Sequence, residues 1–190
     1  FILGYFLIII SLISILEFNK IIIIIFKKKK IKQIFFNILF IIYIFSFSSI
    51  FLVLSSFLQL KVLIFILVLT CIISDIGGYI FGKFFKGKKL TKISPNKTYS
   101  GMIGSFLVSL IIGSIFIHFQ KNILIFEVNA FIIIVAVSLV SQLGDLIISF
   151  FKRKAKIKDT GSILPGHGGI LDRIDGILIA IPFGIILISI

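Results

Sequence analysis

Long apolar runs alternate along the chain with short polar breaks, and most of the breaks carry lysine. A helix needs about 20 apolar residues to cross a bilayer. The sequence offers about six such runs, at residues 1–16, 34–60, 62–82, 101–119, 130–149 and 169–190. The first run extends to residue 26 if Glu17, Asn19 and Lys20 are absorbed at a helix interface, and Lys61 alone separates the second run from the third. The pattern predicts an all-α fold, a polytopic membrane helix bundle with about six transmembrane helices in this chain.

The lysine-rich breaks indicate how the runs are threaded through the bilayer. If the runs cross alternately, residues 27–32, 83–97 and 152–158 all lie on one side, and only Lys61 and Lys121 lie on the other. Short basic loops stay on the cytoplasmic side of a membrane. We therefore expect an integral, multi-pass protein of the cell (inner) membrane whose active site faces the cytoplasm.

Composition excludes two other classes of protein. The chain has 190 residues, 59% of them hydrophobic, and one core of this size could not hide so much apolar surface. Its net charge of +13 is carried by loops beside membrane helices, without an aromatic-interleaved basic motif, so we expect no nucleic-acid partner. The lone Cys71 indicates neither a disulfide nor a metal site. The chain begins with Phe1 instead of Met, so we expect further residues upstream.

Four carboxylates interrupt the apolar runs at one predicted depth. The threading places Asp75, Asp145, Asp172 and Asp175 just under the cytoplasmic surface. Asp172 and Asp175 are three residues apart and share a helix face. A carboxylate at this depth is costly unless it faces a cation or water, which indicates one hydrated pocket. Structural ion pairs with nearby lysines are the alternative explanation.

The residues around these acids suit phosphate chemistry. Carboxylates without cysteine favour a hard cation, so Mg2+ is the expected metal, and it commonly completes its shell with phosphate oxygens. Cations lie nearby at Lys152, Arg153, Lys154, Lys156, Lys158 and Arg173. Phosphoryl or nucleotidyl transfer needs such charges around one pocket. Taken alone, the basic run would be a solvated interfacial loop.

Two glycine patterns have different interpretations. Gly166, Gly168 and Gly169 directly precede the sixth run, where backbone N–H groups and the start of a helix favour anions, although a simple tight turn explains them equally well. Gly101, Ser105, Ser109 and Gly113 recur every four residues in the fourth run. We expect that small-residue stripe to pack closely against a neighbouring helix.

The polar segment from Ser149 to Asp175 resembles the signature of the phosphatidate cytidylyltransferase (CDP-diacylglycerol synthase) family. The matching positions are Ser149, Lys152, Arg153, Lys158, Asp159, His167, Gly168, Gly169, Asp172, Arg173 and Asp175. Upstream, the segment from Asp75 to Lys83, SPNKTYSG at 94–101 and SQLGD at 141–145 are also similar to the family. The resemblance covers about residue 62 to the end of the chain.

This resemblance implies condensation of CTP with phosphatidic acid to CDP-diacylglycerol and pyrophosphate, in a membrane domain at 62–190 that follows N-terminal transmembrane helices at 1–61. It implies Mg2+ binding by Asp145, Asp172 and Asp175, with Lys158 and Asp159 completing the catalytic set. The implied substrate-binding residues are Lys152, Arg153, His167, Gly168, Gly169, Arg173, Asp75, Ser94 and Lys97. A homodimer is also expected.

Two positions depart from the family pattern, because Ser100 and Ile148 stand where the family commonly has Glu. If either Glu assists metal binding or proton transfer, the activity of this chain is weakened. The alternatives are a CTP-dependent lipid kinase of the dolichol or phytol kinase type and a cation or solute transporter. The full basic and acidic signature argues against the kinase. The confinement of the acids to one face argues against the transporter.

Overall fold

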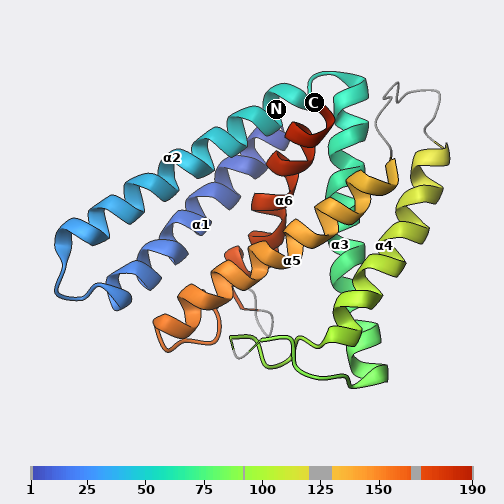
Figure 1. Ribbon diagram of the computed structural model, residues 1–190. Helices are drawn as coiled ribbons and strands as arrows, with labels where there is room; N and C mark the ends of the chain where they lie inside the picture. Colours follow the sequence, from blue (N-terminus) through green and yellow to red (C-terminus); the bar gives the residue numbers. More distant parts are fainter. Residues whose placement is uncertain (1, 92, 120–129, 164–167, 190) are drawn as a thin grey trace. The chain divides into compact units, whose positions relative to one another are not determined.

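We describe residues 2–91, 93–119, 130–163 and 168–189 from a computed structural model (Figure 1). These residues form six α-helices, which are α1 (Ile2–Ile25), α2 (Lys30–Leu54), α3 (Leu58–Phe85), α4 (Tyr99–Phe119), α5 (Ala130–Lys154) and α6 (Leu171–Ser189). The same residues form no strand beyond an isolated antiparallel bridge between Lys89 and Thr98.

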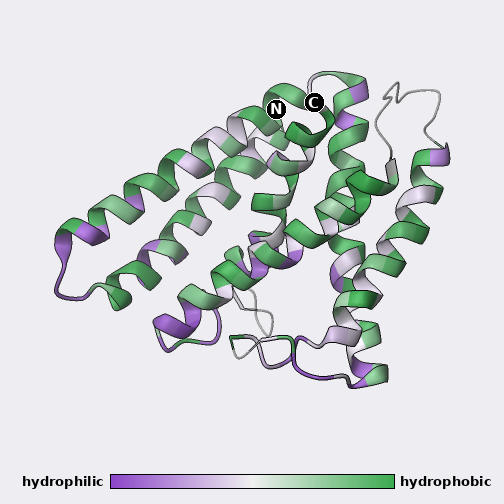
Figure 2. Ribbon diagram, viewed as in Figure 1, coloured by the Kyte–Doolittle hydropathy of each residue, from purple (hydrophilic) through white to green (hydrophobic). Residues whose placement is uncertain are grey.

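Five of these helices, α1 to α5, are long and apolar enough to cross a membrane. The sixth, α6, carries Asp172, Arg173 and Asp175 within its first five residues, and the rest of it is apolar. Figure 2 shows hydrophobic residues along the helices and hydrophilic residues gathered in the connecting segments. The prediction of an all-α, polytopic membrane fold is confirmed.

The end of α1 and the break between α2 and α3 differ from the boundaries that the uninterrupted apolar runs predict. α1 continues without a break through Glu17, Asn19 and Lys20, as in the longer of the two predicted versions. The break between α2 and α3 lies at residues 55–57, so Lys61 belongs to the first turn of α3 and does not separate the two helices. Lysine is a good helix former, so a single lysine does not break a helix. The boundary between α2 and α3 therefore lies at the uncharged residues 55–57 and not at Lys61.

The chain divides into two compact units, and α5 and α6 each contribute to both. The first unit comprises Phe1–Leu54 and Ile147–Asp175, and the second comprises Ser55–Leu146 and Gly176–Ile190. The predicted division into segments 1–61 and 62–190 stays a prediction. The first unit nevertheless groups the two N-terminal helices with most of the recognised signature.

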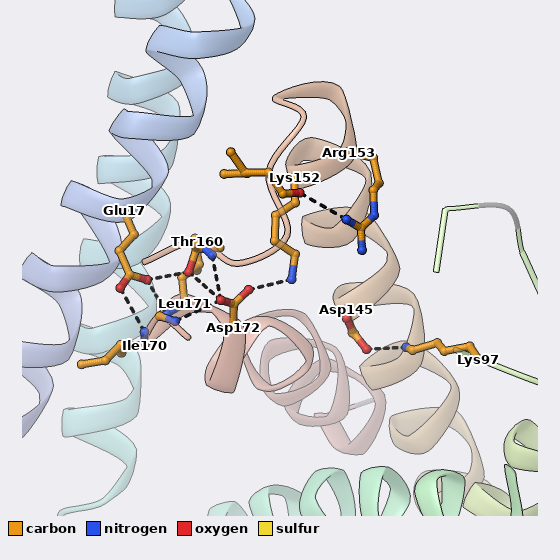
Figure 3. Close-up of polar contacts among 11 residues, drawn as sticks. Glu17, Lys97, Asp145, Lys152, Arg153, Thr160, Ile170, Leu171 and Asp172 are labelled. Carbon is orange, nitrogen blue, oxygen red and sulfur yellow. Dashed lines mark hydrogen bonds and ion pairs between the residues drawn. The ribbon is translucent and has the colours of Figure 1, made fainter. Parts of the chain in front are cut away.

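In the first unit, α1 and α2 lie side by side and run in opposite directions (Figure 1). Phe18 and Phe40 stack with their ring centroids 3.9 Å apart. The Asn37 amide donates to Asn19 Oδ1 at 2.7 Å, which pairs a polar side chain of each helix. Glu17, also on α1, points toward the segment that follows α5 (Figure 3).

In the second unit, α3 and α4 pack closely along the predicted small-residue stripe (Figure 1). Gly101, Ser105, Ser109 and Gly113 are all buried. A Cβ atom added to Gly101 would lie 2.7 Å from the carbonyl oxygen of Gly78, so only glycine permits this approach of the two backbones. The packing role predicted for the stripe is confirmed.

Candidate active site

Lys152 and Asp172 form a buried ion pair in the first unit. Lys152 lies in the last turn of α5 and Asp172 in the first turn of α6. The Lys152 Nζ atom donates to Asp172 Oδ1 at 2.6 Å, and the two side chains are only 10% and 8% exposed (Figure 3). The pair joins two halves of the recognised signature that are separated by 20 residues.

The second oxygen of Asp172 holds the segment between the two helices. Oδ2 accepts from the Thr160 backbone N–H at 2.8 Å, from the Thr160 hydroxyl at 3.0 Å and from the Gly169 N–H at 3.1 Å. Burial opposes ionisation of this carboxyl group, but the hydrogen bonds from Lys152, Thr160 and Gly169 outweigh it and lower the pKa of Asp172 below its ordinary value. Asp172 is therefore held as an anion.

Glu17 of α1 reaches the same segment and is almost completely buried, with 1% of its surface exposed. Its Oε2 accepts from the Thr160 hydroxyl at 2.8 Å and from the Leu171 N–H at 2.8 Å, and its Oε1 accepts from the Ile170 N–H at 3.1 Å (Figure 3). An α1 carboxylate thus lies at the start of α6, where the free N–H groups and the helix dipole favour negative charge.

The glycine turn before α6 was expected to offer its N–H groups to a phosphate. The N–H groups of residues 169–171 are instead taken by Asp172 and Glu17. Gly168 has a φ of +83°, which favours glycine. A Cβ atom at Gly169 would collide with Thr160 Oγ1 and the Glu17 carboxylate. The turn does hold anions, but in this structure the anions are side chains of the protein.

The other predicted residues of the first unit lie around this cluster with different exposure. Arg153, Lys158, Asp159 and Arg173 are exposed, whereas the Asp175 side chain is buried. The Arg153 guanidinium donates to the Ile157 carbonyl at 3.2 Å. The expected role of His167 falls outside the described residues. The exposed cations are the ones that a solvent-borne anion can reach.

The second unit holds the remaining predicted residues, and there Lys97 and Asp145 form an ion pair. The Lys97 Nζ atom lies 2.5 Å from Asp145 Oδ2, with the side chains 23% and 29% exposed (Figure 3). The Lys97 backbone N–H donates to the Ser94 carbonyl at 3.1 Å, which places both residues in one turn. Asp75 is exposed on α3.

Each unit therefore brings together part of the predicted set. Asp172 and Asp175 share α6, Asp172 pairs with Lys152, and Asp145 pairs with Lys97 in the other unit. The structural ion pairs considered as an alternative do form for Asp145 and Asp172. Within the described part of either unit, no three His, Cys, Asp or Glu side chains form a metal-binding group. The single pocket of four acids stays a prediction.

The two departures from the family pattern have local roles. The Ser100 hydroxyl accepts from the Gly87 N–H at 3.2 Å and lies 3.0 Å from the Thr98 hydroxyl, which itself caps α4 by accepting from the Gly101 N–H. Ile148 is 7% exposed in α5. Ser100 is therefore hydrogen-bonded at the start of α4, and Ile148 is buried in α5.

Glu17 is the site residue that the sequence prediction missed. The signal in the sequence was the free-energy cost of burying the Glu17 charge, because a carboxylate inside an apolar run needs hydrogen-bond donors or a cation. We expected Glu17 only to be absorbed at a helix interface. Its partners Thr160 and Leu171 lie 143 and 154 residues further along the chain, and no local spacing rule connects them.

The residues expected to hold Mg2+ fit that ion by their chemistry. Asp145, Asp172 and Asp175 offer only carboxylate oxygens, the ligands that Mg2+ prefers. Asp145 and Asp172 already face an ammonium group, so positive charge is favoured at both positions. Asp172 Oδ2 already accepts from N–H and O–H donors, so Oδ1, which faces Lys152, is the oxygen that would bind a metal.

Comparison with known proteins identifies the family to which the chain is similar. The model of the cytidylyltransferase family matches residues 2–190 of the chain. A phosphatidate cytidylyltransferase of Haemophilus influenzae is 46% identical over 114 residues, which are 58% of this chain and 40% of that protein. Proteins of the same name from Staphylococcus aureus and Rickettsia typhi are 45% and 43% identical over 114 and 125 residues, or 58% and 60% of this chain and 42% and 55% of theirs.

The chain thus spans about half the length of the curated relatives that it matches. The match to the family nevertheless includes the first two helices as well as the ion-paired segment between α5 and α6. On that extent of similarity, the chain belongs to the cytidylyltransferase family.

Proposed function

We propose that this protein condenses CTP with phosphatidic acid to form CDP-diacylglycerol and pyrophosphate. The observation that carries the proposal is the buried Lys152–Asp172 pair, which joins the end of α5 to the start of α6 within the segment that contains the signature residues. The relatives' shared name and the family match support the same reaction.

In the proposed reaction, a phosphate oxygen of phosphatidic acid attacks the α-phosphorus of CTP. A new P–O bond forms, the bond from the α-phosphorus to the bridging oxygen breaks, and pyrophosphate leaves with that oxygen's electron pair. Both substrates are anions, so the protein must supply positive charge without closing the site to water-soluble CTP. The exposed Arg153, Lys158 and Arg173 meet both requirements.

Lys152 has a different proposed role, because its charge is already engaged by Asp172. It orients Asp172 and shares its ammonium with a phosphate only when Asp172 turns to another cation. We propose Mg2+ as that cation, held by Asp145, Asp172 and Asp175, where it would neutralise developing charge on phosphate oxygens. Lys97 would then be released from Asp145 in the same way.

We further propose that the site faces the cytoplasm in the cell (inner) membrane, which is supported by the lysine-rich segments at 27–32, 83–97 and 152–158. CTP is then available on the same side. The expected homodimer stays a prediction. Neither the lipid-kinase nor the transporter alternative gains support, since the named relatives are cytidylyltransferases.

The test uses membranes containing the full chain, phosphatidic acid, Mg2+ and CTP labelled at either the α- or the γ-phosphorus. Cytidylyl transfer moves the α label into lipid and releases the γ label in pyrophosphate. Label from the γ position in lipid would indicate a kinase, and no lipid label above empty membranes would overturn the proposed enzyme. Asp175→Asn should abolish transfer while membrane insertion persists, and the exposed Lys20→Gln serves as control.

A further inference from the structure

We propose that Glu17 is a positioning residue for the active site, through which the N-terminal helix α1 holds Thr160 and the start of α6 in their working arrangement. This inference rests on the proposed function only for its consequence on turnover. The contact itself lies entirely within the first unit.

The described residues place three hydrogen-bond donors against the Glu17 carboxylate. The Thr160 hydroxyl and the N–H groups of Ile170 and Leu171 all point to its two oxygens, at 2.8 to 3.1 Å. An ionised carboxylate accepts only, so it matches this environment, whereas an amide would present an NH2 group to a donor. The side chain is 1% exposed, so water cannot substitute for a lost partner. The site therefore requires the acid and not merely a polar residue.

Thr160 links Glu17 directly to Asp172. Its hydroxyl oxygen lies 2.8 Å from Glu17 Oε2 and 3.0 Å from Asp172 Oδ2, while its backbone N–H donates to the same Asp172 oxygen. The hydroxyl has one hydrogen, so it donates to one carboxylate at a time. Thr160 is the single residue that connects Glu17 to Asp172. The position of Asp172 therefore depends on where Glu17 holds Thr160.

Space around the carboxylate is restricted in a way that suits this role. Hypothetical Cβ atoms at Gly161 and at Gly169 would both collide with the Glu17 side chain. The backbone thus closes around Glu17 from two sides, and the carboxylate cannot move without moving the segment. Helix α1 is consequently part of the active-site unit in addition to being a membrane span.

The first measurement is the rate of trypsin cleavage at the exposed Lys156 and Lys158 in vesicles that expose this segment. Cleavage requires local opening, so it reports how firmly the segment is held. We expect cleavage several-fold faster in Glu17→Ala and intermediate in Glu17→Gln. Asn19→Ala is the matched control, because Asn19 lies on the same helix but bonds to Asn37 of α2. An unchanged rate in Glu17→Ala would overturn the proposal.

The second measurement separates positioning from a general loss of folded protein. Per correctly inserted molecule, kcat should fall by about 10- to 100-fold in Glu17→Ala, the usual range for residues that orient a ligand or catalytic group. A purely structural defect would lower the amount of inserted enzyme and leave kcat per molecule unchanged, which would contradict positioning.

Variants on the loop side keep the proposal testable if Glu17→Ala does not accumulate. Thr160→Val removes the bridging hydroxyl and should accelerate cleavage and lower kcat, whereas Thr160→Ser keeps the hydroxyl and should restore both. Equal behaviour of the two variants would refute the link through Thr160. If the wild-type protein shows no cytidylyl transfer, the proposed function fails, but the cleavage rates still decide whether Glu17 holds the segment.

Discussion

Lys152 and Asp172 are joined by a 2.6 Å contact between Nζ and Oδ1, and this contact ties the end of α5 to the start of α6. Both side chains are nearly buried. Such a pair contributes little net stability over an apolar replacement, but removing one partner leaves a largely buried charge without its counter-ion. Lys152 therefore contributes the largest of the hydrogen bonds that hold Asp172 as an anion, beside those from Thr160 and Gly169.

Lys152→Met should be strongly destabilising for this reason, by about 3–5 kcal/mol. Lys152→Arg should lose less, because it keeps the charge while changing the geometry. The measurement is the heat-unfolding midpoint of the purified full chain in detergent micelles. Lys154→Met is the control, since Lys154 is exposed on the same turn of α5. Equal midpoints for Lys152→Met and Lys154→Met would show that the pair does not hold the two helices together.

The pH dependence of this variant follows from the lowered pKa of Asp172. In the wild type, the stabilisation from the charged carboxylate is present above its ordinary pKa of 3.8 and is lost only as pH falls through the lowered value. Lys152→Met removes the strongest of the contacts that lower this pKa, so the carboxyl binds a proton at a higher pH. Protonation relieves the buried charge of the variant. Its stability deficit should therefore shrink as the pH is reduced from 7 toward 4 in the same unfolding assay, and a constant deficit would contradict this mechanism.

The sequence was sufficient to predict the helices, because the apolar runs are long and the breaks are charged. It predicted less well where one charge lies inside a run. Lys61 interrupts the hydrophobic pattern but lies in the first turn of α3, and the break between α2 and α3 falls at residues 55–57. The existence of the helices follows from composition, but the position of a single lysine does not locate this boundary, because lysine is a good helix former.

The candidate site also contains residues that the sequence could predict and one whose partners it could not. Asp172 and Lys152 could be singled out because they lie close in sequence within a recognisable motif. Glu17 could not be assigned its partners, because its contacts to Thr160 and Leu171 depend on how α1 packs against a distant segment. A carboxylate within an apolar run predicts that hydrogen-bond donors must contact it, but only the tertiary structure identifies those donors.

The glycine that closes around Glu17 provides the most direct test of this packing. A Cβ atom at Gly161 would collide with Glu17 Oε1 and lie 3.0 Å from its Cδ, and the carboxylate is tied by three donors and cannot move aside cheaply. Gly161→Ala should therefore accelerate trypsin cleavage of the loop several-fold. Gly4→Ala is the matched control in α1, where the added Cβ would lie at an ordinary 3.5 Å from Leu52, so cleavage should be unchanged.

Combining Gly161→Ala with Glu17→Ala distinguishes this specific collision from an effect on the unfolded chain. With the Glu17 side chain removed, the space that the new methyl group needs becomes free. The additional effect of Gly161→Ala on the cleavage rate should then largely disappear, because two residues in contact give non-additive effects. If the fold-changes in cleavage rate caused by the two substitutions instead multiply independently, the methyl group acts elsewhere, for example by restricting the unfolded backbone. Contact with the Glu17 carboxylate would then not be the reason that position 161 requires glycine.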